Sequence, residues 1–241
     1  MHTVKRAVIV AAGEGKRMRP VTLTTPKSLV RVNGTRMIDT VIQGLLTNGI
    51  GEIYVVVGYL KGQFKALERE YPGTVTLIEN PWYDSCNNIS SLYAAREHLE
   101  DAIITDADLI IRNSKVLAPQ FERSGYNAVW TDAPTNEWLL TVENGVVSSC
   151  SRTGGAHGWQ LYSVSRWSAQ DGRRLKRHLE LEFEKKHSRD IYWDDVALFR
   201  HPEEYQLGIF PMPPGDITEV DSLAELAALD SSYRKYLREE D

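Results

Sequence analysis

A glycine turn rich in cations follows the first apolar run of the sequence. The run at 7–12 leads into Gly13-Glu14-Gly15. Glycine has no Cβ, so the backbone here can turn sharply and approach a ligand closely. Successive backbone N–H groups in such a turn form a concavity that binds anions. The same stretch adds four positive side chains, Lys16, Arg17, Arg19 and Lys27. The pattern therefore indicates a phosphate-binding site.

The spacing excludes two common phosphate motifs. No Gly-Lys-Ser/Thr stands at the distance from Gly13 that a Walker loop requires, and Met18 occupies the third glycine position of a dinucleotide fingerprint. Pro20 and Pro26 disfavour a helix directly after the glycines, which predicts a long, extended loop. An ordinary turn with solvated basic residues is the alternative for Gly-x-Gly alone. The added arginine, prolines and lysine favour the phosphate site.

A pair of acids follows a second apolar run. Asp106 and Asp108 come directly after 102–105, which reads as a buried strand. An unpaired buried charge is costly, so the pair needs a partner unless it only caps a turn or faces solvent. Mg²⁺ prefers one or two carboxylates together with phosphate oxygens. On the same sheet edge as the glycine turn, these acids predict a Mg²⁺ site.

Two further segments combine aromatic rings with carboxylates. They are Asn136-Glu137-Trp138 and the run 191–195, which contains Tyr192, Trp193 and Asp194. Aromatic residues are most often core or interface residues, and that explanation stays open for each ring. The functional alternative is a cage for a quaternary ammonium group, which ring faces attract by ~2 kcal/mol or more when it is desolvated.

The order of apolar runs predicts the fold class. Strands are expected at 7–12, 52–58, 74–78 and 102–105, and helices at 36–48, 61–71 and 89–99. Alternating strands and helices imply right-handed crossovers and a mainly parallel, Rossmann-like sheet with helices on both faces. Ligands of such sheets lie beyond the carboxyl ends of the strands, where the glycine turn is placed.

The second half of the chain predicts a small region of mixed strands. Short strands are expected within 126–164, with a hairpin at Glu143-Asn144-Gly145. A helix over 165–186 and a strand over 205–212 follow. Ser222 and Glu225 form a capping box that opens the last helix.

Composition fits one globular domain. Hydrophobic residues make up 42% and charged residues 25% of 241 residues, and no linker or repeat divides the chain. We expect a single domain over 1–241. Within it, 1–125 would mostly bind nucleotide, 126–221 mostly the acceptor and metal, and 222–241 would form the C-terminal helix.

Charge and cysteine content narrow the partners and the compartment. A net charge of −5 argues against nucleic acid as a partner. No apolar run reaches the length of a membrane span, so a membrane partner is not expected. Cys86 and Cys150 lie far apart and are interpreted as plain thiols, which together with the absence of a signal peptide predicts a cytoplasmic protein. The oligomeric state is left open.

The glycine turn resembles a known family signature. Ala11-Ala12-Gly13-x-Gly15-x-Arg17-Met18-x-Pro20-x-Thr22, followed by Pro26-Lys27-x-Leu29, is similar to that of the sugar-phosphate and choline-phosphate nucleotidyltransferases. The resemblance implies that this loop holds the triphosphate of a nucleotide, with Arg17 and Lys27 acting as catalytic residues on its phosphates. It also implies a nucleotide-binding set: Ala11, Ala12, Gly13, Glu14, Gly15, Lys16, Arg17, Asn87, Asn88, Ser91 and Asp106.

The same resemblance assigns a Mg²⁺ cofactor. Its members bind metal through the second acid of the strand-end pair, here Asp108, and through an acid near the C-terminus, here Asp221. Glu219 alternates with Asp221 by two, so both carboxylates point the same way if the segment is extended. Glu219 is therefore a third candidate ligand.

The aromatic segments resemble the choline-binding segments of the choline-phosphate branch. This implies that Trp138 and Tyr192 form a cage and that Asp194 faces the ammonium, with Glu137 and Trp193 beside them. The expected activity is Mg²⁺-dependent transfer of CMP from CTP to phosphocholine, giving CDP-choline and pyrophosphate. A 2-aminoethylphosphonate cytidylyltransferase, a sugar-1-phosphate nucleotidyltransferase and a non-catalytic module of this fold remain alternatives. CTP over other nucleotides is not fixed by the residues.

Overall fold

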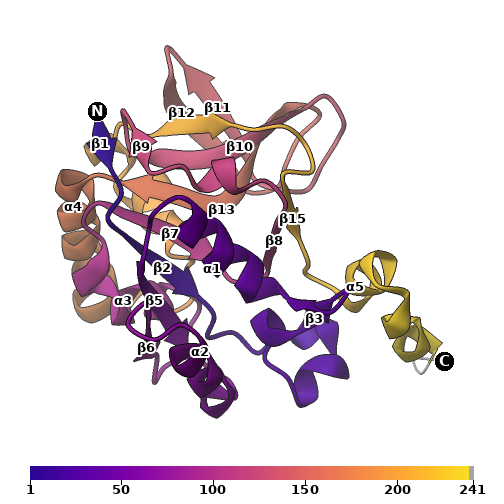
Figure 1. Ribbon diagram of the computed structural model, residues 1–241. Helices are drawn as coiled ribbons and strands as arrows, with labels where there is room; N and C mark the ends of the chain where they lie inside the picture. The colour runs from indigo at the N-terminus through magenta and orange to yellow at the C-terminus, as the bar shows by residue number, and fades with distance from the viewer. Residues whose placement is uncertain (239–241) are drawn as a thin grey trace.

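A nine-stranded sheet forms the centre of the molecule in the computed structural model, which describes residues 1–238 (Figure 1). Its first half is parallel, because β2 pairs with β5 on one side and with β7 on the other, and β6 extends the sheet beyond β5. These strands are β2 (Arg6–Val10), β5 (Glu52–Val57), β6 (Val75–Glu79) and β7 (Ala102–Asp106).

The second half of the sheet is mostly antiparallel. The long strand β13 (Gly158–Trp167) joins the halves, since it pairs antiparallel with both β7 and β10 (Gly125–Thr131). A hairpin of β11 (Leu139–Glu143) and β12 (Val146–Ser151) turns at the predicted Asn144-Gly145. The strand β14 (Gly208–Pro211) runs parallel to β10.

Three short strand pairs lie outside the main sheet. They are β1 (His2–Thr3) with β9 (Gln120–Phe121), β3 (Arg31–Val32) with β4 (Thr35–Arg36), and β8 (Leu109–Ile111) with β15 (Ile217–Glu219). The β8–β15 pair matters most for the site, because it draws a C-terminal segment to the end of β7.

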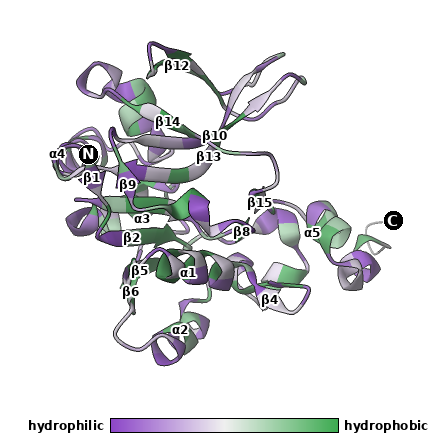
Figure 2. Cartoon of the chain, turned by 45° about the horizontal axis from the view of Figure 1, so that its top comes forward, coloured by the Kyte–Doolittle hydropathy of each residue, from purple (hydrophilic) through white to green (hydrophobic). Residues whose placement is uncertain are grey.

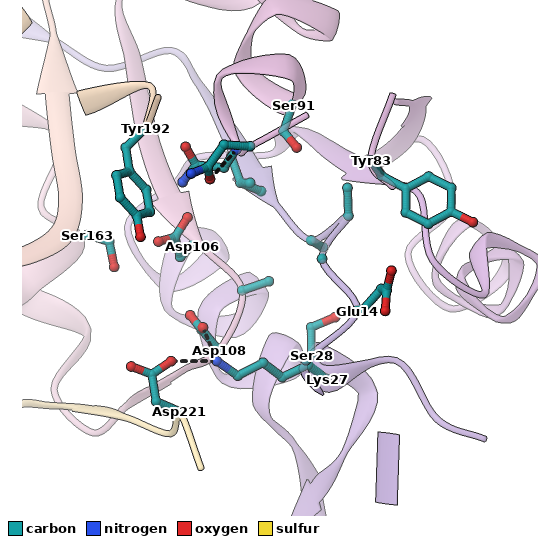
Figure 3. A pocket seen from close by; sticks show the side chains of 18 of the residues that line it. Glu14, Lys27, Ser28, Tyr83, Ser91, Asp106, Asp108, Ser163, Tyr192 and Asp221 are labelled. Atoms are coloured by element: carbon teal, nitrogen blue, oxygen red, sulfur yellow. Dashed lines mark hydrogen bonds and ion pairs between the residues drawn. The ribbon is translucent and has the colours of Figure 1, made fainter. Parts of the chain in front are cut away.

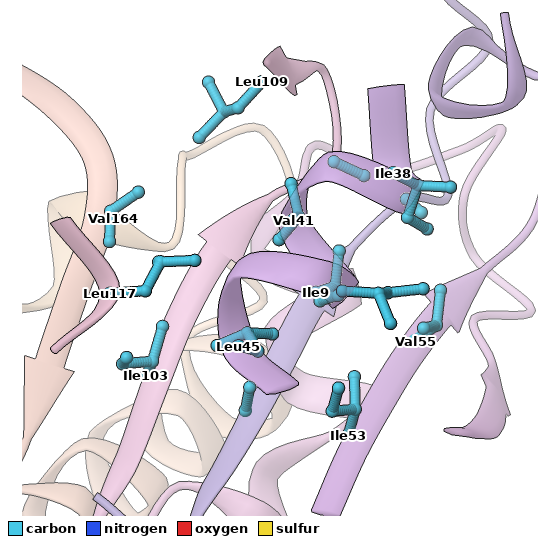
Figure 4. Close-up of a cluster of buried hydrophobic side chains, with 14 of the residues drawn as sticks. Ile9, Ile38, Val41, Leu45, Ile53, Val55, Ile103, Leu109, Leu117 and Val164 are labelled. Atoms are coloured by element: carbon cyan, nitrogen blue, oxygen red, sulfur yellow. The ribbon is translucent and has the colours of Figure 1, made fainter. Parts of the chain in front are cut away.

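Helices cover both faces of the sheet. On one face, α1 (Met37–Thr47) packs Ile38, Val41 and Leu45 against side chains of the central strands (Figure 4). The same apolar cluster includes Leu67 of α2 (Lys65–Glu70). On the other face, α3 (Ile89–Ala94) and α4 (Ala169–Glu180) bury leucines against β2 and β7. Figure 2 shows hydrophobic residues along the central strands, whereas α4 is largely hydrophilic. The predicted α/β class, with a mainly parallel sheet and helices on both faces, is confirmed.

A third apolar cluster connects the glycine turn to the C-terminal helix. Met18 is fully buried against residues of α5 (Leu223–Leu229), with Leu226 among them. The predicted capping box opens α5. The Ser222 side chain accepts a hydrogen bond from the Glu225 backbone N–H, and the Glu225 side chain accepts one from the Ser222 backbone N–H. Residues Ser231–Arg238 continue as a 3-10 helix, so the predicted last helix is interrupted at Asp230. Its predicted end, 239–241, lies outside the described residues.

The predicted helix over 165–186 is wrong at its start. Strand β13 continues to Trp167, because residues 164–167 complete its ladder with β7. The helix begins only after Ser168, whose side chain accepts a hydrogen bond from the backbone of Asp171. Beyond Glu180 the chain widens into a π-helical turn, Leu181–Lys185.

Other predicted elements are shorter or tighter than expected. The helix predicted over 61–71 begins with a 3-10 turn. The helix predicted over 89–99 is α-helical only to Ala94, and a 3-10 turn follows at Arg96–His98. The strand predicted over 205–212 is reduced to β14. The loop predicted to be extended after the glycines instead contains three 3-10 turns, at Lys16–Met18, Val21–Leu23 and Lys27–Leu29. Among residues 1–238, no helix is both long and apolar enough to cross a bilayer.

The packing of α4 on the sheet yields a stability prediction. A Cβ added to Gly172 would lie 2.1 Å from the carbonyl oxygen of Leu99, so the helix must move away from the backbone it touches. We expect Gly172→Ala to lower the free energy of unfolding by about 2 kcal/mol or more, measured by urea denaturation. Gly62→Ala is the control, because no atom lies within 4 Å of its added Cβ. Equal stability of the two variants would contradict this packing.

Candidate active site

A cavity of about 750 Å³ opens at the carboxyl ends of the parallel strands. The glycine turn after β2, the start of α3 and the end of β7 form one side of it. Strand β13, the segment before β11 and a loop near Tyr192 form the other side (Figure 3). The cavity therefore lies where the sequence places a ligand site, beyond the strand ends.

The glycine turn needs glycine at one position above all. Gly15 has a φ of 63°, and a Cβ there would lie 2.9 Å from the Cβ of Lys27. The Thr22 hydroxyl donates to the Gly15 carbonyl at 2.8 Å, which fixes the turn against the following loop. The whole predicted phosphate loop lines the cavity: Ala11, Ala12, Gly13, Glu14, Gly15, Lys16 and Arg17.

Lys27 bridges two acids from distant parts of the chain. Its Nζ lies 2.5 Å from Asp108 Oδ2 and 2.7 Å from Asp221 Oδ1 (Figure 3). Burial alone would lower the pKa of Lys27, but the two carboxylates outweigh this and raise it above its usual value. Arg17 reaches the same Asp221 oxygen at 2.8 Å from the solvent side. Lys27 is therefore fully charged at neutral pH.

Three carboxylates converge beside Lys27. One oxygen from each of Asp108, Glu219 and Asp221 lies within 4.8 Å of the others. Strand β15 presents Glu219 opposite Leu109 of β8, and the Val220 N–H donates to the Asp108 carbonyl at 3.1 Å. The β8–β15 pairing thus brings the C-terminal acids to the end of β7.

The electrostatics of this cluster fit a hard divalent cation. The Oδ1 atom of Asp108 is buried and finds no hydrogen-bond partner among residues 1–238. Burial, followed by Asp108 and Asp221, raises the pKa of Glu219 to about 8. Burial also tends to raise the pKa of Asp221, but Lys27 and Arg17 hold it below its usual range. Carboxylate oxygens gathered at one point fit Mg²⁺, which binds through one or two carboxylates together with phosphate oxygens and waters.

Asp106 extends the acidic surface toward the other side of the cavity. It lies between the cluster of Asp108 and Asp221 and the ring of Tyr192 (Figure 3). Burial raises its pKa well above its ordinary value, and the charges of Asp108 and Asp194 add to this. The cavity thus carries more acid than its own lysine and arginine neutralise, which suits it to cationic ligands.

Two aromatic rings and an acid line the side of the cavity opposite the glycine turn. The rings of Trp138 and Tyr192 meet at 5.6 Å with an interplanar angle of 88°. Asp194 is buried, its Oδ1 has no hydrogen-bond partner in the described part of the chain, and burial raises its pKa to about 7. Glu137 also lines this side. These four predicted acceptor residues are brought together.

Trp193 is the exception among the predicted acceptor residues. It is 1% exposed and does not line the cavity. Its ring packs between Tyr126 and Trp167, with centroids 6.1 Å and 6.2 Å away. The chain turns at this point, so Tyr192 and Trp193 point in different directions. Trp193 belongs to the core.

Three residues at the start of α3, predicted to bind the nucleotide, line the cavity but already make hydrogen bonds to other parts of the protein: Asn87, Asn88 and Ser91. Asn88 Oδ1 accepts from the Trp193 backbone at 2.8 Å, and the Asn87 N–H donates to the Arg189 carbonyl at 2.7 Å. The Ser91 hydroxyl accepts from Asn80 Nδ2 at 3.1 Å. Asn87 and Asn88 thus join the start of α3 to the loop that carries Tyr192.

The sequence prediction missed several residues of the site. Asn80 is 1% exposed and ties the end of β6 to the start of α3 through Ser90 and Ser91. Its place directly after a parallel strand could have indicated it. Ser163 lines the cavity from β13, and its Oγ is buried without a partner. No local pattern marks Ser163, because it lies within a strand predicted only in outline.

Comparison with known protein families shows which family this chain belongs to. The family described as the MobA-like NTP transferase domain matches residues 7–178. The chain belongs to this family. A 2-aminoethylphosphonate cytidylyltransferase of Lancefieldella rimae is 42% identical over 234 residues, which cover 96% of this chain and 94% of the relative. A choline-phosphate cytidylyltransferase of Streptococcus pneumoniae is 32% identical over 231 residues, covering 93% and 96%.

Solved structures agree with this membership of the MobA-like family. The CTP:phosphocholine cytidylyltransferase of Streptococcus pneumoniae superposes with a TM-score of 0.88 at 32% identity, covering 95% of this chain and 99% of that one. The inositol-1-phosphate CTP transferase of T. maritima shares the fold, with a TM-score of 0.77 at 18% identity and coverage of 96% and 94%. The chain is a nucleotidyltransferase of the cytidylyltransferase type.

Asp194 makes stability depend on pH. Its pKa is raised from 3.8 to about 7, so the folded protein binds this proton more tightly than the unfolded chain. The free energy of unfolding therefore falls as pH rises from about 4 to about 7 and then levels. Asp194→Asn removes this contribution. Relative to the wild type, the variant should gain roughly 4 kcal/mol between about pH 4 and about pH 8.

Urea denaturation of both proteins at the two pH values measures this difference. Asp190→Asn is the matched control, because Asp190 is exposed in the same loop. A constant stability difference between Asp194→Asn and wild type across this pH range would contradict the raised pKa.

Proposed function

We propose that this protein transfers CMP from CTP to a small phosphonate or phosphate that carries a primary amine, of the 2-aminoethylphosphonate class. The observation that carries the proposal is a pair of buried oxygens at the acceptor side. Among residues 1–238, neither Asp194 Oδ1 nor Ser163 Oγ has a partner at hydrogen-bond distance, although the Tyr126 hydroxyl lies near Asp194 and Asp106 lies near Ser163, and both residues line the cavity. Such groups are costly unless a ligand satisfies them.

The chemistry of the amine explains why these oxygens matter. A primary ammonium has three N–H donors, whereas a quaternary ammonium has none and is held by ring faces. Two rings, Trp138 and Tyr192, line this side, and the guanidinium of Arg152 lies 5.5 Å from the Trp138 centroid. A pocket with free acceptors and few ring faces suits a primary amine. The relative that is 42% identical carries the matching activity in its name.

Phosphocholine is the second candidate acceptor, and it remains our prediction from the sequence. The perpendicular arrangement of Trp138 and Tyr192 favours it, because two rings at 88° present apolar walls to a methylated cation. The relative that is 32% identical, and the solved structure with a TM-score of 0.88, are phosphocholine enzymes by name.

We assign the nucleotide to the other side of the cavity. We assign the triphosphate to the turn 11–17, whose backbone N–H groups and cations suit it. Lys27 and Arg17 are assigned to the phosphates, as the family resemblance implies. When bound at Asp108, Glu219 and Asp221, Mg²⁺ would supply further neutralisation of phosphate charge. That the cations and acids meet in one cavity argues against a non-catalytic module.

The transfer needs no nucleophilic side chain. An oxygen of the acceptor phosphonate attacks the α-phosphorus of CTP, a new P–O bond forms, and the bond to the β-phosphate breaks to release pyrophosphate. The acceptor is an anion near neutral pH, so no general base is required, by analogy with phosphomonoesters. The work of the protein is to bring two anions together in line and offset their charge. Lys27 and Arg17 do this from the nucleotide side, while Asp194 orients the amine.

A screen of substrates tests the proposed function. Pyrophosphate release is measured for each of four nucleotides with 2-aminoethylphosphonate, phosphocholine and a sugar 1-phosphate. We expect CTP with 2-aminoethylphosphonate to give the highest kcat/KM, exceeding CTP with phosphocholine by about tenfold or more. A higher kcat/KM for phosphocholine would reverse the two candidates, and no release with any pair would overturn both.

Ser163→Ala sharpens the same screen. If the Ser163 hydroxyl accepts from the ammonium, its loss raises the KM for 2-aminoethylphosphonate and leaves that for phosphocholine unchanged. Equal effects on both acceptors would remove Ser163 from amine recognition.

Asp108→Asn tests the metal assignment. The variant keeps the shape of the side chain but loses its charge, so we expect it to fold and to lose turnover by about a hundredfold or more at saturating Mg²⁺. Asp84→Asn is the control, since Asp84 lines the same cavity but stands outside the acid cluster. Circular dichroism checks folding, and pyrophosphate release checks turnover. Wild-type turnover in Asp108→Asn would exclude the assignment.

A further inference from the structure

The acceptor loop, defined as residues 186–195, connects two π-helical turns. One turn is Leu181–Lys185 and the other is Val196–Arg200. Residues 186–193 form no regular secondary structure, although Tyr192 and Asp194 must be held in place. Backbone hydrogen bonds of a helix or sheet cannot fix this loop. The loop is held instead by single backbone hydrogen bonds to neighbouring segments, such as the one from the Asn87 N–H to the Arg189 carbonyl at 2.7 Å, and by side-chain contacts.

Glu182 contacts both ends of the acceptor loop. Its carboxylate accepts from Ser188 Oγ at 2.9 Å and from Lys186 Nζ at 2.6 Å, at the start of the loop. It also pairs with His201 Nε2 at 2.9 Å, just beyond the second π-helical turn. The Ser188 N–H adds a bond to the Glu182 carbonyl at 2.9 Å. One side chain thus closes the base of the loop.

The histidine in this cluster is itself fixed in orientation. A carboxylate only accepts hydrogen bonds, so His201 must carry a proton on Nε2 to bind an ionised Glu182. The His201 ring stacks on that of His178 of α4 at 3.9 Å and 13°. His178 Nδ1 in turn lies 2.9 Å from the Tyr205 hydroxyl. The base of the loop is therefore anchored to the face of the main sheet that α4 covers.

The far side of the loop is anchored to the nucleotide wall. Asn88, at the start of α3, holds the backbone of Trp193 at 2.8 Å. Trp193 fills the core beneath, while the neighbouring Tyr192 is 46% exposed and faces the cavity. The loop is held at its base, at Arg189 through the Asn87 N–H, and at Trp193, and Tyr192 faces the cavity between the last two of these anchors.

A contribution to stability alone does not readily explain why a buried glutamate occupies position 182. It is fully buried, with 0% of its side chain exposed. Replacing a buried ion pair by apolar residues of similar volume is often neutral or stabilising, whereas fixing one arrangement of the chain is a better attested use of such pairs. Lys186 pairs with the Glu182 charge and Ser188 donates a hydrogen bond to it, and both partners lie at the start of the loop.

We propose that Glu182 is a positioning residue that sets the affinity for the acceptor amine without touching it. Glu182 does not line the cavity. Its contacts with Ser188 and His201 fix the path of the loop, and that path places Tyr192 and Asp194. The inference rests on the proposed function, because it takes the acceptor site to lie at these two residues.

The test compares Glu182→Gln with the wild type by steady-state kinetics of pyrophosphate release. The acceptor is whichever one the wild type uses best, so a wild type without activity rejects the proposed function before the variant is considered. Glutamine keeps the shape but turns an N–H₂ group toward donors. We expect the KM for the acceptor to rise about tenfold, with the KM for CTP and kcat changed less than about twofold.

Glu180→Gln is the matched control for this variant. Glu180 lies on the same helix with 35% of its side chain exposed, and its ion pairs are 3.4 Å and 3.9 Å long. It should leave both KM values unchanged. Equal rises of both KM values in Glu182→Gln, or a lower melting temperature with an unchanged acceptor KM, would show that Glu182 only stabilises the fold.

Ser188→Ala keeps the proposal falsifiable if Glu182→Gln fails to fold. It removes one hydroxyl from the base of the loop, and we expect a rise of about threefold in the acceptor KM alone. Where both variants fold, the double variant should match Glu182→Gln, because the two residues act through one contact. Additive effects, or an unchanged acceptor KM in Ser188→Ala, would overturn the proposal.

Discussion

The ion pairs of Lys27 with Asp108 and Asp221 are the contacts on which the site depends. They join residues 81 and 194 positions apart in the sequence, so they link the first loop, the end of β7 and a C-terminal segment. All three side chains are largely buried, with 15%, 19% and 27% exposed. A buried ion pair is weak support for stability, since desolvation offsets much of its attraction. Its value here is to assemble three segments around one charge.

The cavity around these pairs is left with an excess of acid. Burial and mutual repulsion raise the pKa of Asp106, Asp194 and Glu219. Each raised pKa means that ionising the group costs free energy in the folded protein. Cations that enter the cavity would remove this cost. The empty site therefore lowers the stability of the fold, and bound cations would restore it. Enzymes often give up stability for function in this way. The same excess explains why Lys27 rests on the acids in the free protein.

Sequence patterns predicted the parallel half of the fold because its strands are buried on both faces and read as continuous apolar runs. They also predicted that the glycine turn and Asp108 lie together, since the ends of parallel strands share one edge, whereas Asp221 was assigned from the family resemblance. They failed where contacts are non-local. The start of α4 depends on the ladder of β13 with β7, which no window around Ser168 contains. Trp193 looks like its neighbour Tyr192 in sequence, and only the turn separates their directions.

The two sides of the cavity are built differently, and this bears on acceptor choice. The nucleotide side rests on strand ends and a fixed glycine turn, whereas Tyr192 and Asp194 stand on a loop held by side chains such as Glu182. Relatives 42% and 32% identical to this chain differ by name in the amine they use. An apolar pocket distinguishes one methyl group by only about 1–3 kcal/mol, while an unsatisfied hydrogen-bonding group discriminates far more strongly. Discrimination between a primary and a quaternary amine should therefore depend on the buried oxygens of Ser163 and Asp194 more than on the rings.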